Sequence, residues 1–325
     1  MVPPPTKGHT VADAEGSGFQ DRGLPLTALA VAAGRAVESS RPDRLVWDPF
    51  AADLVLAARS HVDMPVQWPA RPADATPLQQ PLLLASIYIG MRTRFIDDFV
   101  LDGATAQTVI LGAGLDTRAF RLEWPADARI FEIDSANVLD FKDSVLAGLA
   151  ATPGPDRTIL HADLSQPWRR HLVSAGFDPG RSTTWVLEGL LPYLDAAGQQ
   201  AVLGEVAALS APGSRAVIER AVPLPKTDDL DAQLQEFSLR TGLPMSELLA
   251  RADPPDPVSV LEAAGWRCAQ HSVQDLCTAY GRVISLAEST SARPASGNAR
   301  DAGAEPSSSA QPGDQSRGGF VTAWL

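Results

Sequence analysis

The chain has 325 residues, of which 20% are charged and 45% are hydrophobic, and its formal net charge at pH 7 is −12. A chain of this length fits one large domain or two ordinary ones, and a domain of about 300 residues buries about 75% of the surface that its unfolded chain exposes. The acidic balance argues against a surface for nucleic acid or for an anionic membrane, because no run of Lys and Arg offsets it.

Cysteine use, the N-terminus and the apolar stretches bear on compartment and cofactors. The two cysteines, Cys268 and Cys277, do not make a metal site at this spacing, so we expect no metal and interpret both as reduced packing residues. The N-terminus lacks the basic-then-apolar order of a signal peptide, and the longest apolar stretch, 81–91, is too short to span a bilayer. We therefore expect a soluble, cytoplasmic protein without a membrane or nucleic-acid partner.

The first hundred residues predict a helical region behind a disordered arm. Residues 1–23 are rich in Pro, Gly and polar residues, which is typical of disorder. The remaining residues, 24–325, are expected to form one domain, whose residues 24–100 are mainly helical. Thr27 is a candidate cap of the first helix, and Arg35 is interpreted as a residue of its solvated face. The expected helices cover residues 27–39, 50–59 and 81–100, with a Pro-rich loop over 60–80.

The strongest amphipathic pattern belongs to the helix expected over residues 81–100. Arg94 and Asp98 are four residues apart, and we expect them to pair on the exposed side. Arg92 lies beside the apolar stripe, where a rim residue and a ligand contact are equally good interpretations. The helix leads into the first strand, so its end is expected near the glycine turn described next. Its stripe consists of Leu84, Ile87, Tyr88, Met91, Phe95 and Phe99.

The most informative stretch of the chain is residues 108–134. A short apolar run ends in Gly112-Ala113-Gly114, a brief helical segment follows, and a second apolar run ends in Asp134. Strand, glycine turn, helix, strand and acid in this order are the layout of a nucleoside-cofactor site. Glycine lets the backbone approach a ligand, and the acid can accept hydrogen bonds from both ribose hydroxyls. Plain turn chemistry is the alternative, since many strand–helix turns carry two glycines.

The residue three positions after Gly114 bears on which nucleoside binds. A pyrophosphate-binding turn has a third glycine close to this point, whereas the chain has Thr117. The missing glycine favours a ligand without a pyrophosphate, and S-adenosylmethionine (SAM) is the obvious one. The sequence therefore predicts SAM as the cofactor and leaves a nicotinamide dinucleotide as the less favoured alternative.

Strands and helices alternate regularly after the glycine turn. This alternation predicts a mainly parallel, doubly wound sheet, in which ligands lie outside the carboxyl ends of the strands. The strands are expected over residues 108–111, 128–133, 157–162, 184–187 and 215–218, and the helices over 136–149, 167–175 and 196–209.

The alternation breaks after the fifth strand. The Pro-rich segment 221–257 is interpreted as a cap or lid over the site. A helix over 258–264 and a strand over 266–273 follow. Residues 289–318, rich in Ser, Ala, Gly and Pro, are interpreted as a flexible insert. A last strand over 320–325 suits an antiparallel pair at the sheet edge.

Acidic residues follow four of the predicted strands. One acid at a strand end is commonly a cap or turn residue, but several at the ligand-binding edge favour a site. Asp163 can accept a hydrogen bond from the adenine amino group, with Leu164 packed on the ring. Glu188 faces the cationic methionine end in this interpretation, Arg92 pairs with the methionine carboxylate, and Glu219 is structural. The four acids are Asp134, Asp163, Glu188 and Glu219.

Together these motifs resemble a known family. The segments LGAGLDTRAFRL (111–122), FEID (131–134), ADL (162–164) and WVLEGLLPYL (185–194) resemble the leucine carboxyl methyltransferase-like family of SAM-dependent methyltransferases. The similarity is closest to an actinobacterial branch that is also similar to polyketide O-methyltransferases. It implies an α/β class I methyltransferase fold, Rossmann-like, with a seven-stranded mainly parallel sheet, a reversed last strand, N-terminal helices and a cap insertion. It also implies SAM contacts at Asp134, Asp163, Leu164, Gly112, Arg92 and Glu188, and a weaker one at Arg35.

The resemblance implies methyl transfer from SAM to a carboxylate or hydroxyl oxygen of a small molecule. A carboxylate is already ionised at pH 7, whereas a hydroxyl requires a general base. No histidine stands in an obvious base position: His161 is interpreted as a packed strand residue, and Tyr193 as an acceptor contact or a core residue. We assign no catalytic residue. A SAM-binding protein without turnover and an NAD-dependent oxidoreductase are the alternatives, and the acceptor and oligomeric state are not readable from the sequence.

Overall fold

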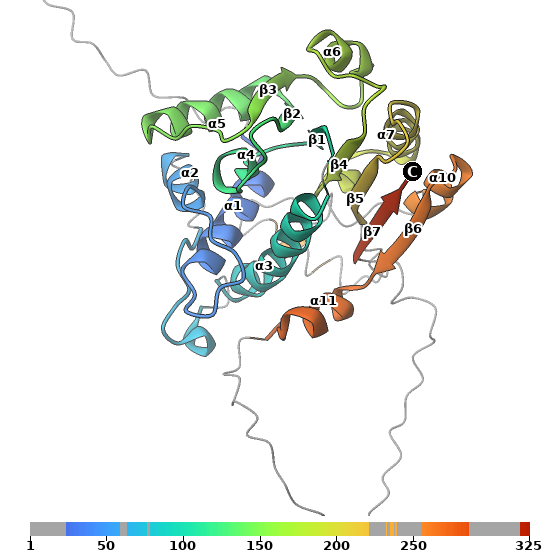
Figure 1. The fold of residues 1–325 in the computed structure, drawn as a ribbon. Helices are drawn as coiled ribbons and strands as arrows, with labels where there is room; N and C mark the ends of the chain where they lie inside the picture. Colours follow the sequence, from blue (N-terminus) through green and yellow to red (C-terminus); the bar gives the residue numbers. More distant parts are fainter. Residues whose placement is uncertain are drawn as a thin grey trace, which may run out of the picture.

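The computed structural model describes residues 24–58, 64–76, 79–103, 105–220, 255–285 and 319–325, together with four isolated positions, 232, 235, 236 and 238. Figure 1 shows these segments as a central sheet with helices on both of its faces. The expected arm, nearly all of the expected cap and the expected flexible insert lie outside the described residues.

The central sheet has seven strands in the order β3-β2-β1-β4-β5-β7-β6. Strands β1 to β5 are parallel to one another, and β7 runs antiparallel to both β5 and β6. The parallel strands with one reversed strand confirm the class I methyltransferase topology. The strands are β1 Gln107–Leu111, β2 Arg129–Asp134, β3 Asp156–His161, β4 Thr183–Leu187, β5 Arg215–Arg220, β6 Arg267–His271 and β7 Gly319–Trp324.

One expectation about the last strand is wrong. The sequence suggests that residues 320–325 pair at the sheet edge, but β7 lies between β5 and β6, so β6 is the edge strand. Every residue of β7 except Trp324 is buried, which fits a strand that is paired on both sides and covered on both faces.

Helices cover both faces because successive side chains of a strand point to opposite sides. Val109 and Leu111 of β1 belong to one apolar cluster with α6 Arg169–Ser174, α7 Ala196–Ala208 and α10 Pro257–Ala263. Ile110, between them, belongs to the opposite cluster. That cluster includes α3 Gln79–Leu101, α4 Arg118–Arg121, α5 Ala136–Gly148 and α11 Val273–Tyr280.

A third apolar cluster joins the N-terminal helices to α5. It contains residues of α1 Leu26–Ser39 and α2 Ala51–Ala57, with Val138 and Phe141 of α5. Helix α1 also packs closely along α3: a Cβ built on Gly34 would lie 2.4 Å from the Cδ1 atom of Ile89. Two short 3-10 helices, η1 Pro72–Asp74 and η2 Leu191–Tyr193, complete the described elements.

Local sequence explains where most elements begin and end, with two corrections. Helix α1 begins at Leu26 after Pro25, so Thr27 lies inside the helix and does not cap it. Helix α11 is not predicted from the sequence, although Ser272 and Asp275 form a capping box at its start. The same cap ends β6 at His271, two residues before the end of the expected strand.

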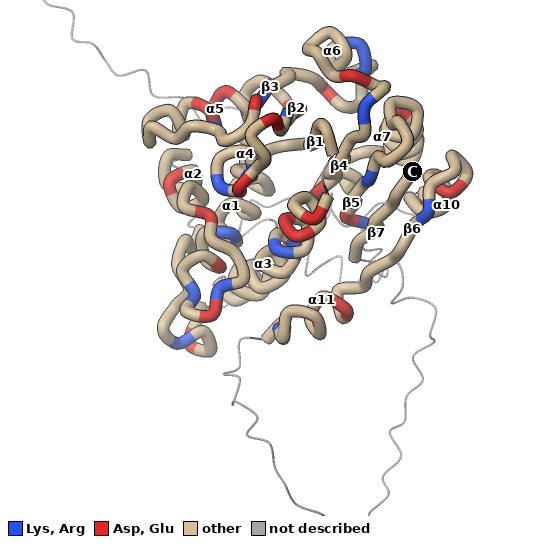
Figure 2. The backbone as a smooth tube through the Cα atoms, in the orientation of Figure 1, with Lys and Arg blue, Asp and Glu red and all other residues tan. Residues whose placement is uncertain are grey.

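Three expectations about surface and composition can be compared with the described residues. None of their helices is long and apolar enough to cross a membrane, and none of their His, Cys, Asp and Glu residues form a metal-binding group of three or more. Both cysteines are free and half-buried. Figure 2 shows acidic and basic residues interspersed over most of the described elements.

Candidate functional site

Strand register places four chemically important residues in one row. Leu111 of β1 is the register partner of Ile133 in β2 and of Leu187 in β4, and Leu187 is the partner of Ile218 in β5. The residues that follow these four therefore come level at the carboxyl edge of the sheet. In the order of the strands they are Asp134, Gly112, Glu188 and Glu219, about 4.8 Å apart from strand to strand.

The glycine turn after β1 supports the first acid of this row. Gly112 and Gly114 have φ values of +68° and +47°, in the left-handed region that glycine adopts most readily. The turn aims the Gly114 N–H at Asp134, where it donates to Oδ2 at 2.7 Å. The Ser135 N–H donates to Oδ1 at 2.6 Å. Two backbone donors therefore fix the orientation of the Asp134 carboxylate.

The acid after β3 is held in a similar way. Asp163 Oδ1 accepts hydrogen bonds from the Ser165 N–H at 2.8 Å and from its hydroxyl at 2.7 Å. These bonds favour the ionised form and lower the pKa of the exposed Asp163 carboxyl. Leu164, between the two, packs partly against the core. The Asp163 carboxylate and the Leu164 side chain are thus placed at the end of the sheet beyond β2.

One cavity of about 850 Å³ brings all six expected site residues together. It lies at the carboxyl ends of the parallel strands, where doubly wound sheets bind their ligands. Residues of α1, α3 and η2 also line it, and so do Tyr88 and Glu219, which were not expected as site residues. The expected residues in its lining are Gly112, Asp134, Asp163, Leu164, Glu188 and Arg92, with Arg35 in addition.

Arg92 connects two acids of the row. Its Nε atom lies 2.9 Å from Glu188 Oε1, and its Nη1 atom donates to Glu219 Oε2 at 2.8 Å. The Arg92 side chain is 7% exposed, so the interpretation as a rim residue is wrong. The contact with Glu188 is an ion pair rather than an aligned hydrogen bond, because Nε has no hydrogen-bond partner by geometry.

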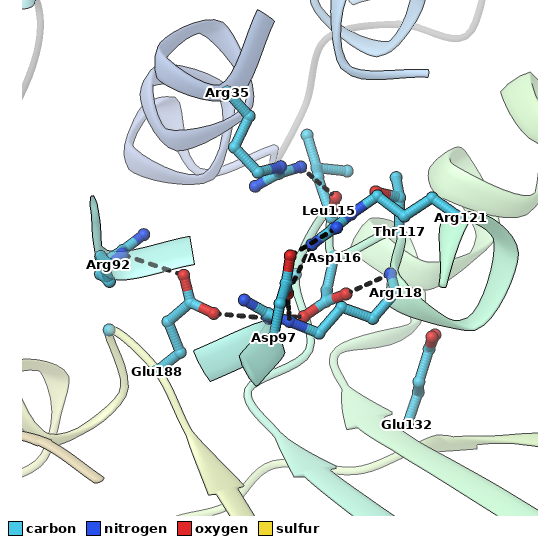
Figure 3. A network of polar contacts seen from close by, with 12 residues as sticks. Arg35, Arg92, Asp97, Leu115, Asp116, Thr117, Arg118, Arg121, Glu132 and Glu188 are labelled. Carbon is cyan, nitrogen blue, oxygen red and sulfur yellow. Dashed lines mark hydrogen bonds and ion pairs between the residues drawn. The ribbon is translucent and has the colours of Figure 1, made fainter. Parts of the chain in front are cut away.

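A second arginine, Arg118, fixes the other side of Glu188 (Figure 3). It donates to Glu188 Oε2 at 2.6 Å and to Asp97 Oδ1 at 2.7 Å, and it pairs closely with Asp116. Burial alone would raise the pKa of the Glu188 carboxyl, but Arg118 and Arg92 outweigh it and the pKa is lowered. Glu188 is therefore a buried carboxylate whose two oxygens each face a guanidinium group.

The whole cluster carries more acids than bases. Arg92, Arg118 and Arg121 face four carboxylates, and Arg121 closes the cluster with two contacts to Asp97, at 2.6 and 2.8 Å. The cluster therefore has an excess of one negative charge. The four carboxylates belong to Asp97, Asp116, Glu188 and Glu219.

Glu219, interpreted from the sequence as a structural residue, also lines the cavity. It lines the cavity at the end of β5, and its Oε1 atom accepts a hydrogen bond from the Tyr88 hydroxyl at 2.5 Å. Its Oε2 atom also accepts the Gly189 N–H at 2.8 Å. Tyr88 lies four residues before Arg92 on α3, so both reach the same acid from one helix face. That spacing is the sequence signal that could have revealed this pair.

Three other interpretations of single residues are corrected. Arg35 is 5% exposed and donates to Asp48 at 2.8 Å and to the Leu115 carbonyl at 2.6 Å, so it does not lie on a solvated face. His161 is not packed in the core: it is partly exposed and pairs with Asp140 at 3.1 Å. Tyr193 is 46% exposed and lines the cavity, so it is not a core residue. The expected Arg94–Asp98 pair is confirmed at 2.7 Å.

Comparisons with known proteins show the family to which the chain belongs. The family model described as "Leucine carboxyl methyltransferase" matches residues 28–207. A relative from Saccharopolyspora erythraea is 41% identical over 266 residues, which are 81% of this chain and 90% of that protein. One from Streptomyces coelicolor is 40% identical over 266 residues, 80% of this chain and 87% of that protein. Both carry the name "Putative S-adenosyl-L-methionine-dependent methyltransferase".

Among solved structures, a crystal structure described as a "putative methyltransferase from Thermobifida fusca YX" covers 96% of this chain and 98% of its own. Its sequence identity is 17% and its TM-score is 0.45.

The fold is that of a class I methyltransferase, and the family match and the two relatives show a SAM-dependent methyltransferase. The chain belongs to the leucine carboxyl methyltransferase family, since the family model matches more than half of its residues.

Proposed function

We propose that the cavity binds SAM along the row of strand ends and that the protein transfers the methyl group of SAM to an oxygen atom of a small molecule. The observation that carries this proposal is the Asp134 carboxylate, held level with the glycine turn by the Gly114 N–H. An acid in this place is suited to the two hydroxyls of a ribose.

The nucleoside half of the cofactor fits the β2–β3 side of the cavity. Oδ2 of Asp134 accepts one backbone N–H and keeps a further lone pair for a ribose hydroxyl. Oδ1 accepts the Ser135 N–H and, at 3.2 Å, the Ser135 hydroxyl, whose place a second ribose hydroxyl can take. The Asp163 carboxylate is held by Ser165 and suits the adenine amino group. Leu164, which also lines the cavity, offers an apolar surface for the ring.

The methionine half fits the β1–β4 side. Its ammonium and sulfonium groups are cationic, and the cluster around Glu188 has one carboxylate more than it has guanidinium groups. Arg92 has a buried Nε–H without an aligned acceptor, which a methionine carboxylate can satisfy after a small rotation of the guanidinium group. Its place in the cavity lining and this unaligned N–H support the assignment of Arg92 as a ligand contact.

SAM supplies a methyl group on a sulfonium sulfur, which makes the carbon reactive without further activation. The residues of the chain therefore mainly hold the two reactants in line and keep water out. The size of the cavity, about 850 Å³, is in the range of small-molecule sites. We therefore propose a small acceptor whose carboxylate or hydroxyl oxygen receives the methyl group.

The substitution Asp134→Ala tests the cofactor assignment. It removes the two hydrogen bonds of the ribose to a charged group, so we expect the affinity for S-adenosylhomocysteine to fall by about 100-fold. Calorimetric titration measures this affinity. Asp127→Ala, on an exposed turn, is the matched control and should bind like the wild type. Wild-type affinity in the Asp134→Ala variant would contradict the assignment.

A further inference from the structure

Beyond Glu188, the row of strand ends continues to Glu219. In the strand order, β5 lies one strand past β4 and two past the glycine turn of β1. If the nucleoside lies over β3 and β2 and the methionine over β1 and β4, then Glu219 stands at the acceptor end of the cavity. The inference that follows rests on the proposed function, since it uses this placement of the cofactor.

Tyr88 and Glu219 form a hydrogen-bonded pair at that end. The Tyr88 hydroxyl donates to Glu219 Oε1 at 2.5 Å, while Oε2 accepts from Arg92 and from the Gly189 N–H. Both side chains line the cavity. The oxygen of Tyr88 therefore has a lone pair available on the cavity side, and its proton is already directed at a carboxylate.

The other acids of the cavity are less well placed than Glu219 to accept a proton from an acceptor. Glu188 faces a guanidinium group on each oxygen, and Asp116 is bonded to Arg118. Asp134 and Asp163 lie on the nucleoside side. No histidine occurs among the described residues that line the cavity. Glu219 is thus the acid best placed to receive a proton from an acceptor, with Tyr88 between them.

The wall next to Tyr88 is apolar. Leu82, Ala85 and Ile89 recur at intervals of three and four residues, so one face of α3 lines the cavity up to Arg92. From Tyr88 to Leu82 this face continues for six residues, or about 9 Å along the helix. Further apolar residues in and beside α1 and η2 line the same cavity: Pro25, Ala28, Val31, Leu190, Pro192 and Leu194.

We propose that Tyr88 is a catalytic residue that relays the acceptor proton to Glu219, and that the acceptor is a phenol or enol with an apolar body of about two fused rings. The reaction that this predicts is methylation of a neutral hydroxyl. A body of this size matches the apolar wall of about 9 Å beside Tyr88.

The proposed step forms one bond to carbon, breaks another and moves two protons. A lone pair of the acceptor oxygen forms the bond to the methyl carbon, and the carbon–sulfur bond breaks with its electrons remaining on sulfur. The acceptor proton passes to Tyr88 Oη, and the Tyr88 proton passes to Glu219 Oε1. The products are a methyl ether, S-adenosylhomocysteine and a protonated Glu219, which later releases its proton to water.

The negative charge of Glu219 and the acidity of the acceptor hydroxyl together favour a phenol or enol as the acceptor. A carboxylate acceptor would bring a second anion next to Glu219, where Arg92 is already shared with Glu188. A phenol has an ordinary pKa of about 10 and gives up its proton to a weak base far more readily than an aliphatic alcohol does. Burial and the neighbouring Glu219 raise the pKa of Tyr88 well above 10, so Tyr88 stays protonated and can relay.

Comparison of acceptors tests the class. Holding SAM constant, we would assay 2-naphthol and 2-naphthoate with the full-length protein and detect the methyl ether or methyl ester by mass spectrometry. We expect the ether only. Formation of the ester in preference, or of neither product by a protein that binds SAM in calorimetry, overturns the inference. A protein that does not bind SAM would instead refute the proposed function.

The substitution Tyr88→Phe tests the relay. We expect kcat for 2-naphthol to fall about 100-fold or more, with KM and SAM affinity nearly unchanged. The variant should be rescued by 4-nitro-1-naphthol, which loses its proton at neutral pH without a base and spreads the negative charge over the ring and the nitro group, away from Glu219. Glu219→Gln should behave in the same way towards the two acceptors. A purely structural role would slow both acceptors alike, and that result would overturn the relay.

Matched controls exist for both substitutions. Tyr280→Phe removes a remote hydroxyl that bonds Asp98 at 3.2 Å, and Glu205→Gln removes an exposed carboxylate of α7. Both controls should keep wild-type rates with both acceptors. A control that loses the rate for 2-naphthol and regains it with 4-nitro-1-naphthol would also contradict the relay.

Discussion

At the scale of single residues, Arg118 is the centre of the ion-pair cluster beneath the cavity. Its side chain is 3% exposed and contacts the carboxylates of Asp97, Asp116 and Glu188. Buried charges are stable only when they are paired, so one guanidinium group holds three acids from three parts of the chain. Arg118 thereby keeps Glu188 in line with the other acids of the row.

Replacement of Arg118 by methionine should destabilise the protein strongly. The variant leaves buried carboxylates without their main partner, which costs about 3–5 kcal/mol in the free energy of unfolding. Denaturant unfolding at neutral pH measures the loss. Arg169→Met is the matched control, because Arg169 is about half exposed and pairs with Glu205 at 3.4 Å. A loss as small as that of the control would contradict the account of the cluster.

The Arg118→Met variant should also change how the free energy of unfolding depends on pH. Burial opposes ionisation of Asp116, but Arg118, Arg121 and Lys142 outweigh it and lower its pKa from 3.8 to about 2. A carboxyl whose pKa is lowered in the folded protein stabilises the fold at pH values above its pKa in the unfolded chain. This contribution is lost as the pH falls towards the lowered pKa. The free energy of unfolding should therefore drop between about pH 4 and pH 2, and less steeply in Arg118→Met than in the wild type.

Residue types at strand ends were predictable, but their partners were not. Local patterns identify Asp134, Asp163 and Glu188 because each directly follows an apolar strand. The ion pairs of Arg92 join residues 96 and 127 positions apart, and no local pattern encodes such contacts. The burial of Arg35 could not be predicted either, because its partners Asp48 and Leu115 lie outside α1.

At the scale of elements, α3 is the helix that connects the core to the cavity. Ile87, Met91 and Ile96 are buried in the core cluster beneath the sheet. Arg92 and Tyr88 reach the acids of the row, and the residues before them form the apolar wall. In the proposed function, α3 therefore carries the cofactor contact Arg92 and, in the ten residues before it, the acceptor contacts.

A larger side chain on α3 at the proposed acceptor end of the cavity should impair acceptor binding and leave cofactor binding intact. Ala85 is exposed and lines the apolar wall, so Ala85→Phe places a ring in the space that we assign to the acceptor. We expect KM for 2-naphthol to rise about tenfold or more, since overfilling a site costs about 1–3 kcal/mol. SAM affinity, measured by calorimetry, should not change.

Ala197→Phe, at an exposed position of α7, is the control for an added ring. It should leave both constants as in the wild type. A large fall in SAM affinity in Ala85→Phe would place the cofactor at this end and contradict the assignment.

Most elements follow from local sequence with shifts of one or two residues at their ends. The strands and the long helices have clear apolar patterns, which tertiary packing preserves. Helix α11 was missed because the apolar run before it predicts a strand, and only the capping box at Ser272 marks the change. The predicted position of β7 at the sheet edge was also wrong, because long-range contacts set the pairing between strands.

At the scale of the whole molecule, the order of strands explains how one cavity serves two reactants. Four of the five parallel strands place Asp134, Gly112, Glu188 and Glu219 along one edge, where we propose that the cofactor and the acceptor bind side by side. Helices α1 and α3 close this edge from outside (Figure 1). The parallel sheet was predictable from alternation, whereas the packing of the N-terminal helices over its edge depends on contacts such as Gly34 with Ile89.

The central claim is that this edge binds SAM, and titration of the purified wild-type protein tests it most directly. Calorimetry with SAM, and separately with NAD, compares the two nucleoside cofactors that the glycine turn permits. We expect SAM to bind with a dissociation constant in the micromolar range and NAD not to bind. Binding of NAD without binding of SAM would contradict the account.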